Sequence, residues 1–256
     1  MTTVRRAEVS SVFGLDIGGS GIKGAPVDLA RGELTAERVR VVTPPGAKVP
    51  DVAKIAGEVV AGFGYEGLIG AAFPAVIVDG RALTASNVDA GWIGTDVAGT
   101  LAAATGGEVA AINDADAAGL AEMRFGAGRG IAGTVALLTL GTGIGSALFL
   151  DGALVPNTEF GHIEIDGQDA ETKTAESARE REGLTWEHWA RRVSKYLRHL
   201  EAVLWPDLFI LGGGVSRKAD KFLPLLEGVR TKVVVAQLQN DAGIIGAALW
   251  AAETHH

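Results

Sequence analysis

Short hydrophobic runs alternate along the chain with stretches whose apolar residues recur every three or four positions. The short runs are bounded by glycine, proline or aspartate, a pattern typical of buried strands. They lie at 12–17, 22–28, 67–73, 108–112, 134–140 and in "PDLFILG" at 206–212. A further strand is expected to end near Val42, and a hairpin is expected over 76–85 around Asp79-Gly80.

The amphipathic stretches predict helices. The clearest covers 186–204, where tryptophan, valine and leucine recur at helical spacing. Others are expected at 51–62, at 95–105 with Thr95 or Asp96 as the cap, at 113–126, after the glycines at 212–214, and near the C-terminus with Asn240 or Asp241 as the cap.

One arrangement, strand, glycine turn and strand, occurs twice. "LDIGGSGIKGA" at 15–25 is followed by "LTLGTGIGSA" at 138–147. Asp16 and Thr139 occupy equivalent positions 123 residues apart (139 − 16), about half the chain. This self-similarity suggests duplication of one α/β unit, with the two turns facing each other across a cleft. The domains expected are 1–110, closed by a C-terminal helix at about 241–252, and 111–240.

The composition excludes several classes of protein. The chain has 256 residues, 47% hydrophobic and 21% charged, which is typical of a soluble globular protein. With no cysteine it has neither disulfides nor a thiolate nucleophile, which suits the cytoplasm. The net charge of −8 argues against broad nucleic-acid binding. The uncharged run 131–150 contains several glycines and predicts two buried strands rather than a membrane span. The N-terminal "MTTVRRAEVSS" lacks the apolar core of a secretory signal.

Three glycine turns, each directly after a hydrophobic strand, are candidate phosphate sites. Backbone N–H groups in such turns can surround a phosphate without obstruction by side chains. A single turn of this kind more often serves plain chain geometry, but three in one duplicated chain favour phosphate binding. None has the Walker spacing. The candidate residues are Gly18, Gly19 and Ser20, then Gly141, Thr142 and Gly143, then Gly213 and Gly214.

The same turns resemble the phosphate-1, phosphate-2 and adenosine segments of the actin/hexokinase/Hsp70 ATPase superfamily. "AINDADAAGLAE" (111–122) and "EFGHIEIDG" (159–167) resemble the sugar-binding motifs of the ROK family of repressors and sugar kinases. "WPDLFILGGGVSRKAD" and "NDAGIIGAA" are most similar to actinobacterial members that use polyphosphate. The resemblance implies a duplicated α/β, ribonuclease H-like fold with two domains around a cleft. It also implies transfer of a phosphoryl group from polyphosphate, with ATP as a second donor, to the 6-hydroxyl of glucose.

The resemblance also implies roles for individual residues. From the residues alone, Asn113-Asp114 is favoured as a helix N-cap. The resemblance instead makes Asp114 the carboxylate that accepts the proton of the attacking sugar hydroxyl. It implies sugar contacts for Asn113, Asp114, Glu159 and His162, with Asn87 of "SNVDAGW" as a further candidate.

A metal site is expected at the first turn. Asp16 is suited to hold Mg²⁺ through water beside the phosphates, although it could also cap its own turn. Lys23 is the cation assigned to the donor. The cysteine cluster that usually follows the histidine in the ROK family is missing from 163–178, so no structural zinc is expected and His162 is interpreted as a sugar contact. The other cations, Arg217, Lys218 and the basic face of 186–204, are expected mostly at the surface.

Three alternatives stay open. The first is an ATP-only hexokinase of the same family, acting on glucose, mannose or fructose. The second is a sugar-responsive regulator, although the roughly eleven residues before the first strand are too few for a helix-turn-helix. The third, a catalytically silent sugar-binding protein, is opposed by Asp114 and the two phosphate turns. The family resemblance implies a cytoplasmic homodimer that binds neither nucleic acid nor membrane.

Overall fold

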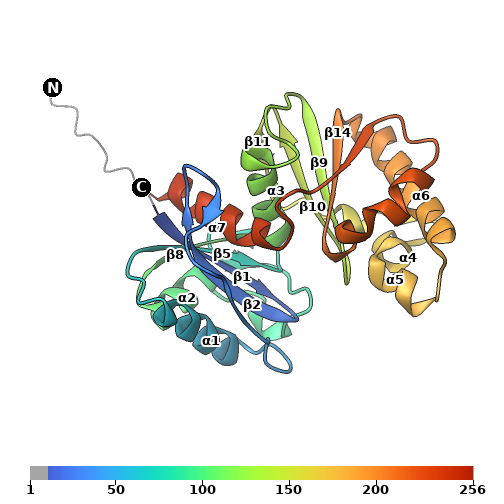
Figure 1. The fold of residues 1–256 in the computed structure, drawn as a ribbon. Helices are drawn as coiled ribbons and strands as arrows, with labels where there is room; N and C mark the ends of the chain where they lie inside the picture. Colours follow the sequence, from blue (N-terminus) through green and yellow to red (C-terminus); the bar gives the residue numbers. More distant parts are fainter. Residues whose placement is uncertain (1–10, 256) are drawn as a thin grey trace. The chain divides into compact units, whose positions relative to one another are not determined.

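The computed structural model describes residues 11–255, and the N-terminal segment for which no secretory signal is expected lies almost wholly outside them (Figure 1). The chain forms two compact units. One comprises the chain up to Ala117 together with the segment from Gly243 onward, and the other comprises Ala118–Ala242. Among the described residues, no helix is long and apolar enough to cross a membrane.

The first unit is built on a mixed sheet of six strands. Its order is β3-β2-β1-β5-β8, with β4 also paired to β2. The glycine turn joins the antiparallel pair β1 and β2, while β1, β5 and β8 run parallel. The strands are β1 Ser11–Gly18, β2 Gly21–Asp28, β3 Glu33–Leu34, β4 Val39–Val41, β5 Leu68–Phe73 and β8 Glu108–Asn113.

Helices cover both faces of this sheet. Phe13 and Leu15 pack in one core with α1 (Val49–Gly62) and α2 (Val97–Thr105). Gly14, which lies between them and so points to the other face, meets α7 (Ala242–Thr254). A Cβ on Gly14 would lie 2.0 Å from the carbonyl oxygen of Ile244, and one on Gly70 would lie 1.8 Å from that of Ala247. Only glycine therefore allows α7 to approach the sheet this closely.

Smaller elements of the first unit follow the predictions. The hairpin of β6 (Ile77–Val78) and β7 (Arg81–Ala82) turns at Asp79 and Gly80, both with positive φ. A 3₁₀ turn that was not predicted, η1, covers Ala90–Trp92. Asp96 is the cap of α2, because its carboxylate accepts the N–H of Gly99 at 2.9 Å.

The second unit repeats the strand arrangement of the first. Its sheet has the order β11-β10-β9-β14-β15, in which β9 and β10 form the hairpin and β14 and β15 run parallel to β9. The predicted duplication is therefore confirmed, and the uncharged run 131–150 forms two strands. The strands are β9 Thr134–Leu140, β10 Ile144–Leu150, β11 Ala153–Val155, β14 Leu208–Gly212 and β15 Lys232–Val235.

Two helices cover the second sheet. The predicted helix 186–204 is α6 (Trp186–Leu204), capped by Thr185, and it packs on the face that carries Leu138 and Phe209. The opposite face carries Val135 and packs against α3 (Asp114–Phe125). The boundary between the two units falls inside α3.

The structure corrects the expectation of a helix after β14. Gly214–Lys221 forms a 3₁₀ helix, η3, with a kink at Lys218, followed by η4 (Leu223–Leu225). The Ser216 hydroxyl donates to the carbonyl of Gly213 at 2.8 Å, a local bond that competes with the α-helical pattern.

Several further elements were not predicted. Besides the strands β11 and β15, they are η2 Phe160–His162, β12 Glu164–Ile165, β13 Gln168–Asp169, α4 Glu171–Thr174, α5 Glu176–Arg181 and the 3₁₀ turn η5 Gln239–Asp241 before α7.

Candidate active site

The first glycine turn brings Asp16 and Lys23 together. The two residues pair across β1 and β2, and Lys23 Nζ lies 2.6 Å from Asp16 Oδ2. Their side chains are 24% and 17% exposed, so the pair is partly accessible from solvent. A Cβ on Gly243 would lie 3.0 Å from the carboxyl carbon of Asp16, which places this carboxylate beside the start of α7.

Side chains from outside the turn hold its carbonyl groups. Thr43 Oγ1 donates to the carbonyl oxygen of Gly18 at 2.5 Å, and Arg40 donates to that of Ser20 at 3.1 Å. Asn87, in a left-handed conformation with φ 61°, lies against the turn, because a Cβ on Gly19 would be 2.6 Å from its carbonyl oxygen. The sequence did not single out Arg40 or Thr43, since neither belongs to a motif and both bind main-chain atoms.

Asn113 and Asp114 lie at the junction of β8 and α3. The Asn113 amide is buried: its oxygen accepts the N–H groups of Ala115 and Asp116 at 2.9 and 3.0 Å, and its nitrogen donates to the carbonyl of Ala75 at 3.0 Å. Asn113 is thus the N-cap of α3. The half-buried Asp114 accepts the N–H of Ala115 at 2.9 Å, and a carboxylate can accept further hydrogen bonds.

In the second unit, Glu159 and His162 lie at the two ends of η2. His162 Nδ1 is 2.9 Å from Asp169 Oδ2, and this hydrogen bond, with the nearby carboxylates of Glu171 and Glu159, raises the pKa of His162. Burial raises the pKa of Glu159. Since Asp169 engages Nδ1, His162 has Nε2 available for a substrate hydroxyl.

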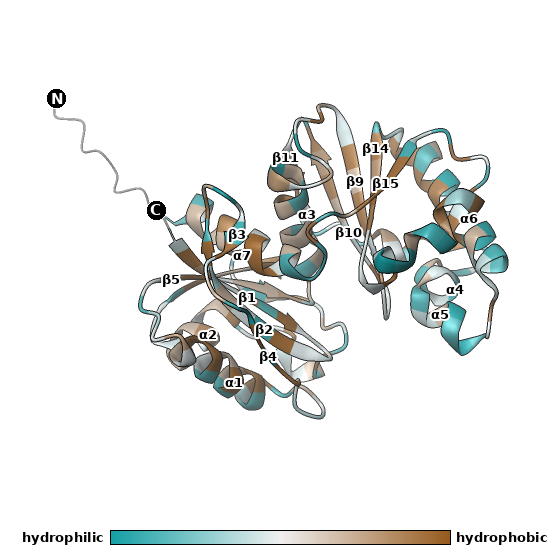
Figure 2. Cartoon of the chain, viewed as in Figure 1, coloured by the Kyte–Doolittle hydropathy of each residue, from teal (hydrophilic) through white to brown (hydrophobic). Residues whose placement is uncertain are grey.

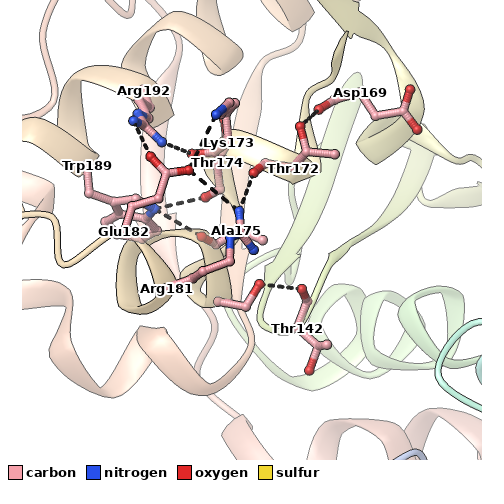
Figure 3. A network of polar contacts seen from close by, with 11 residues as sticks. Thr142, Asp169, Thr172, Lys173, Thr174, Ala175, Arg181, Glu182, Trp189 and Arg192 are labelled. Atoms are coloured by element: carbon pink, nitrogen blue, oxygen red, sulfur yellow. Dashed lines mark hydrogen bonds and ion pairs between the residues drawn. The ribbon is translucent and has the colours of Figure 1, made fainter.

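The second glycine turn contacts the unpredicted segment that contains α4 and α5. Glu171 Oε2 accepts the N–H of Ile144 at 3.0 Å. Ser177 donates its N–H to the carbonyl of Gly141 at 3.0 Å. Its hydroxyl donates to the carbonyl of Thr142 at 2.6 Å, the bond drawn at Thr142 in Figure 3. Sequence reasoning missed both residues, because the segment matches no motif.

The third glycine turn lies beside the second. Gly213 has φ 83°, and a Cβ there would be 2.6 Å from the carbonyl oxygen of Leu140, the residue that precedes Gly141. Gly214 faces Glu176, whose Oε1 accepts from Lys218 at 3.1 Å. Phosphate candidates Gly141, Thr142, Gly143, Gly213 and Gly214 therefore gather in the second unit, while Gly18, Gly19, Ser20 and Lys23 gather in the first.

Basic side chains outside the glycine turns bind other groups of this protein. Arg192 lies 2.7 Å from Glu182, Lys195 pairs with Asp166, and Arg198 donates to the carbonyl of Glu227 at 2.8 Å. Arg217 donates to Asn240 at 3.3 Å. Within residues 11–255, no group of three or more His, Cys, Asp and Glu side chains is arranged to hold a metal ion.

Comparisons with known proteins give one consistent result. The sequence pattern of the ROK family matches residues 12–178. Polyphosphate glucokinase of Mycobacterium tuberculosis (strain CDC 1551 / Oshkosh) is 53% identical over 246 residues, which cover 95% of this chain and 92% of that protein.

Two solved structures are similar over almost the whole chain. The inorganic polyphosphate/ATP-glucomannokinase of Arthrobacter sp. strain KM matches with a TM-score of 0.93 and 49% identity, covering 96% of this chain and 100% of that one. A ROK family glucokinase from Streptomyces griseus, in complex with glucose and AMPPNP, matches with a TM-score of 0.81 and 26% identity over 95% of this chain and 99% of that one. These neighbours confirm the predicted fold class.

Proposed function

The chain belongs to the ROK family, and from this premise we propose that it phosphorylates glucose at the 6-hydroxyl, with inorganic polyphosphate as donor and ATP as a second donor. The observation that carries the proposal is the 53% identity to a polyphosphate glucokinase over 95% of the chain. The 49% identity to a polyphosphate/ATP-glucomannokinase supports the choice of both donors.

In the proposed reaction the glucose 6-oxygen attacks the terminal phosphorus of the donor. The new O–P bond forms as the bond to the bridging oxygen breaks, so that the donor leaves one phosphate shorter. Asp114 accepts the hydroxyl proton, for which a carboxylate at the start of α3 is suited. The sugar hydroxyls are bound by Glu159, by His162 Nε2 and by the remaining N–H of Asn113. Asn87, near the first turn, is a further sugar contact.

The donor phosphates bind to N–H groups of the glycine turns, supplemented by Lys23. Magnesium fits Asp16, because this cation commonly binds one or two carboxylates together with substrate phosphates and water rather than an all-protein cage. Bound there, Mg²⁺ would neutralise charge on the transferred group. The Lys23 ammonium lies 2.6 Å from Asp16 Oδ2 and holds this carboxylate in place beside the first glycine turn.

Two further statements belong to the same proposal. The protein forms a homodimer, as the family resemblance implies, and sedimentation of the purified protein measures this oligomeric state. A cytoplasmic location is favoured by the absence of cysteine.

A coupled assay tests the proposal. Polyphosphate and ATP are offered separately, with glucose and fructose as acceptors, and glucose 6-phosphate is detected. We expect product from ATP-free polyphosphate with glucose. Product from ATP but none from ATP-free polyphosphate would reject the donor assignment in favour of the ATP-only hexokinase. No product from either donor would favour a non-catalytic sugar-responsive protein.

A further inference from the structure

We propose that α5 is a positioning element for the phosphate donor, in which the consecutive residues Glu176 and Ser177 hold the third and second glycine turns. The segment that leads into α5 replaces the cysteine cluster that usually follows the histidine in the ROK family. In Figure 2, α4 and α5 are coloured mainly white and teal, whereas α7 is largely brown. The Ser177 hydroxyl reaches a main-chain carbonyl of the second turn, and the Glu176 carboxylate lies beside the third turn and binds Lys218. The inference rests on the proposed function only in naming the bound group as a phosphate chain.

Ser177 fixes the orientation of two successive peptide groups. Its N–H binds the carbonyl of Gly141 at 3.0 Å and its hydroxyl binds the carbonyl of Thr142 at 2.6 Å, so both carbonyls point toward α5. In a planar trans peptide the N–H points opposite to the carbonyl. The N–H groups of Thr142 and Gly143 are therefore directed away from α5, side by side.

These two N–H groups have no hydrogen-bond acceptor among residues 11–255. Successive N–H groups that point the same way form a concave site for an anion. The next N–H, that of Ile144, is bound by Glu171 at 3.0 Å, which separates it from the pair. The turn thus presents its free donors on one side because α4 and α5 occupy the other.

Glu176 extends the same control to the third turn. Its Oε1 accepts from Lys218 in η3 at 3.1 Å, and its Oε2 would lie 3.6 Å from a Cβ on Gly214. The Glu176 side chain is only 14% exposed, and that of its partner Lys218 is 43% exposed. Because residues 176 and 177 are adjacent, α5 contacts both the second and the third turn.

The segment is in turn held by α6 (Figure 3). Trp189 donates its indole N–H to the carbonyls of Thr174 and Ala175 at 2.9 and 3.3 Å. Arg192 binds Glu182 at 2.7 Å and the carbonyl of Lys173 at 3.1 Å. The pKa of Glu182 is lowered to about 2, chiefly by the hydrogen bond from Arg192, so this carboxylate stays ionised at neutral pH.

The test compares three variants. Ser177→Ala removes the hydroxyl that holds Thr142, Ser177→Thr keeps it, and Thr172→Val removes a hydroxyl of the same segment that binds the carbonyl of Asp169 at 2.7 Å instead of a glycine turn. From the loss of one hydrogen bond we expect Ser177→Ala to raise the KM for tripolyphosphate about fivefold. The KM for glucose should change by less than about twofold, and Ser177→Thr and Thr172→Val should resemble the wild type.

A second measurement does not depend on turnover. In the folded wild-type protein, tripolyphosphate should shift the amide signals of Thr142 and Gly143 more than that of exposed Gly167, and Ser177→Ala should require about fivefold more tripolyphosphate for the same shift. An unchanged donor KM and titration in Ser177→Ala, or an equal effect of Thr172→Val, would overturn the inference. If the wild type showed no phosphoryl transfer, the proposed function would fail, while the titration would still decide the role of α5.

Discussion

Gly143 and Gly141 lie in the same turn but differ in the space around them, which gives a matched pair of substitutions. A Cβ on Gly143 would lie 2.5 Å from Glu171 Oε2, whereas a Cβ on Gly141 has no neighbour within 4 Å. Gly141 and Gly143 are not among the glycines with a positive φ, so alanine is compatible with the backbone at both. In Gly143→Ala the carboxylate must retreat by about 1 Å, which breaks its hydrogen bond to the N–H of Ile144.

The expected loss of stability follows from that single bond. A hydrogen bond to a charged group contributes about 1.5–3 kcal/mol, and because Glu171 is half-exposed we take the low end, about 1.5 kcal/mol. For a domain of this size that is about 3–6 °C in Tm. Gly141→Ala should change Tm by less than about 2 °C.

Calorimetry of the two variants without ligand measures the difference. In a Glu171→Ala background Gly143→Ala should cost almost nothing more, because the clashing atom is gone. The reasoning fails if Gly143→Ala and Gly141→Ala are equally stable, or if the cost of Gly143→Ala persists in the Glu171→Ala background.

Two further predictions concern salt and pH. The KM for long polyphosphate should rise steeply with salt while that for neutral glucose changes little, because the Debye length falls from about 10 Å at 0.1 M to about 3 Å at 1 M; equal responses of both would contradict a cationic donor site. The raised pKa of His162 means that its bond to Asp169 stabilises the folded state below about pH 6.5, and that this contribution is lost as pH rises through the folded pKa. Asp169→Asn should therefore lower the His162 pKa measured by NMR and flatten the pH dependence of stability in that window, and an unchanged pKa would show that Asp169 is not the cause.

The elements that the sequence predicted best are those governed by local patterns. The helix 186–204 was predicted with both ends because its apolar residues recur over five turns, and the structure adds Thr185 as its N-cap. The strand pairs around the glycine turns were predictable because hydrophobic runs and glycines adjoin each other. Asp96 as a cap and the turn at Asp79-Gly80 likewise depend on adjacent residues.

What the sequence did not predict depends on contacts between distant side chains and main-chain carbonyls. Thr43 binds Gly18, and Ser177 binds Gly141 and Thr142; no spacing rule connects such pairs. The segment 163–185 has little hydrophobic periodicity, so its short elements left no pattern to read. Asn113 has more than one role. Its side-chain amide caps α3 and binds the carbonyl of Ala75, and the residue is also expected to bind sugar.

The most direct measurement compares wild type and Asp114→Asn for glucose 6-phosphate formed from ATP-free polyphosphate and glucose. The substitution keeps the size of the side chain and the acceptor that binds the N–H of Ala115, so the fold and glucose binding should persist. We expect clear product from the wild type. The rate of Asp114→Asn should be lower by about a hundredfold or more, because the carboxylate that accepts the proton is lost. No product from the wild type, or nearly equal rates from both proteins, would contradict the account.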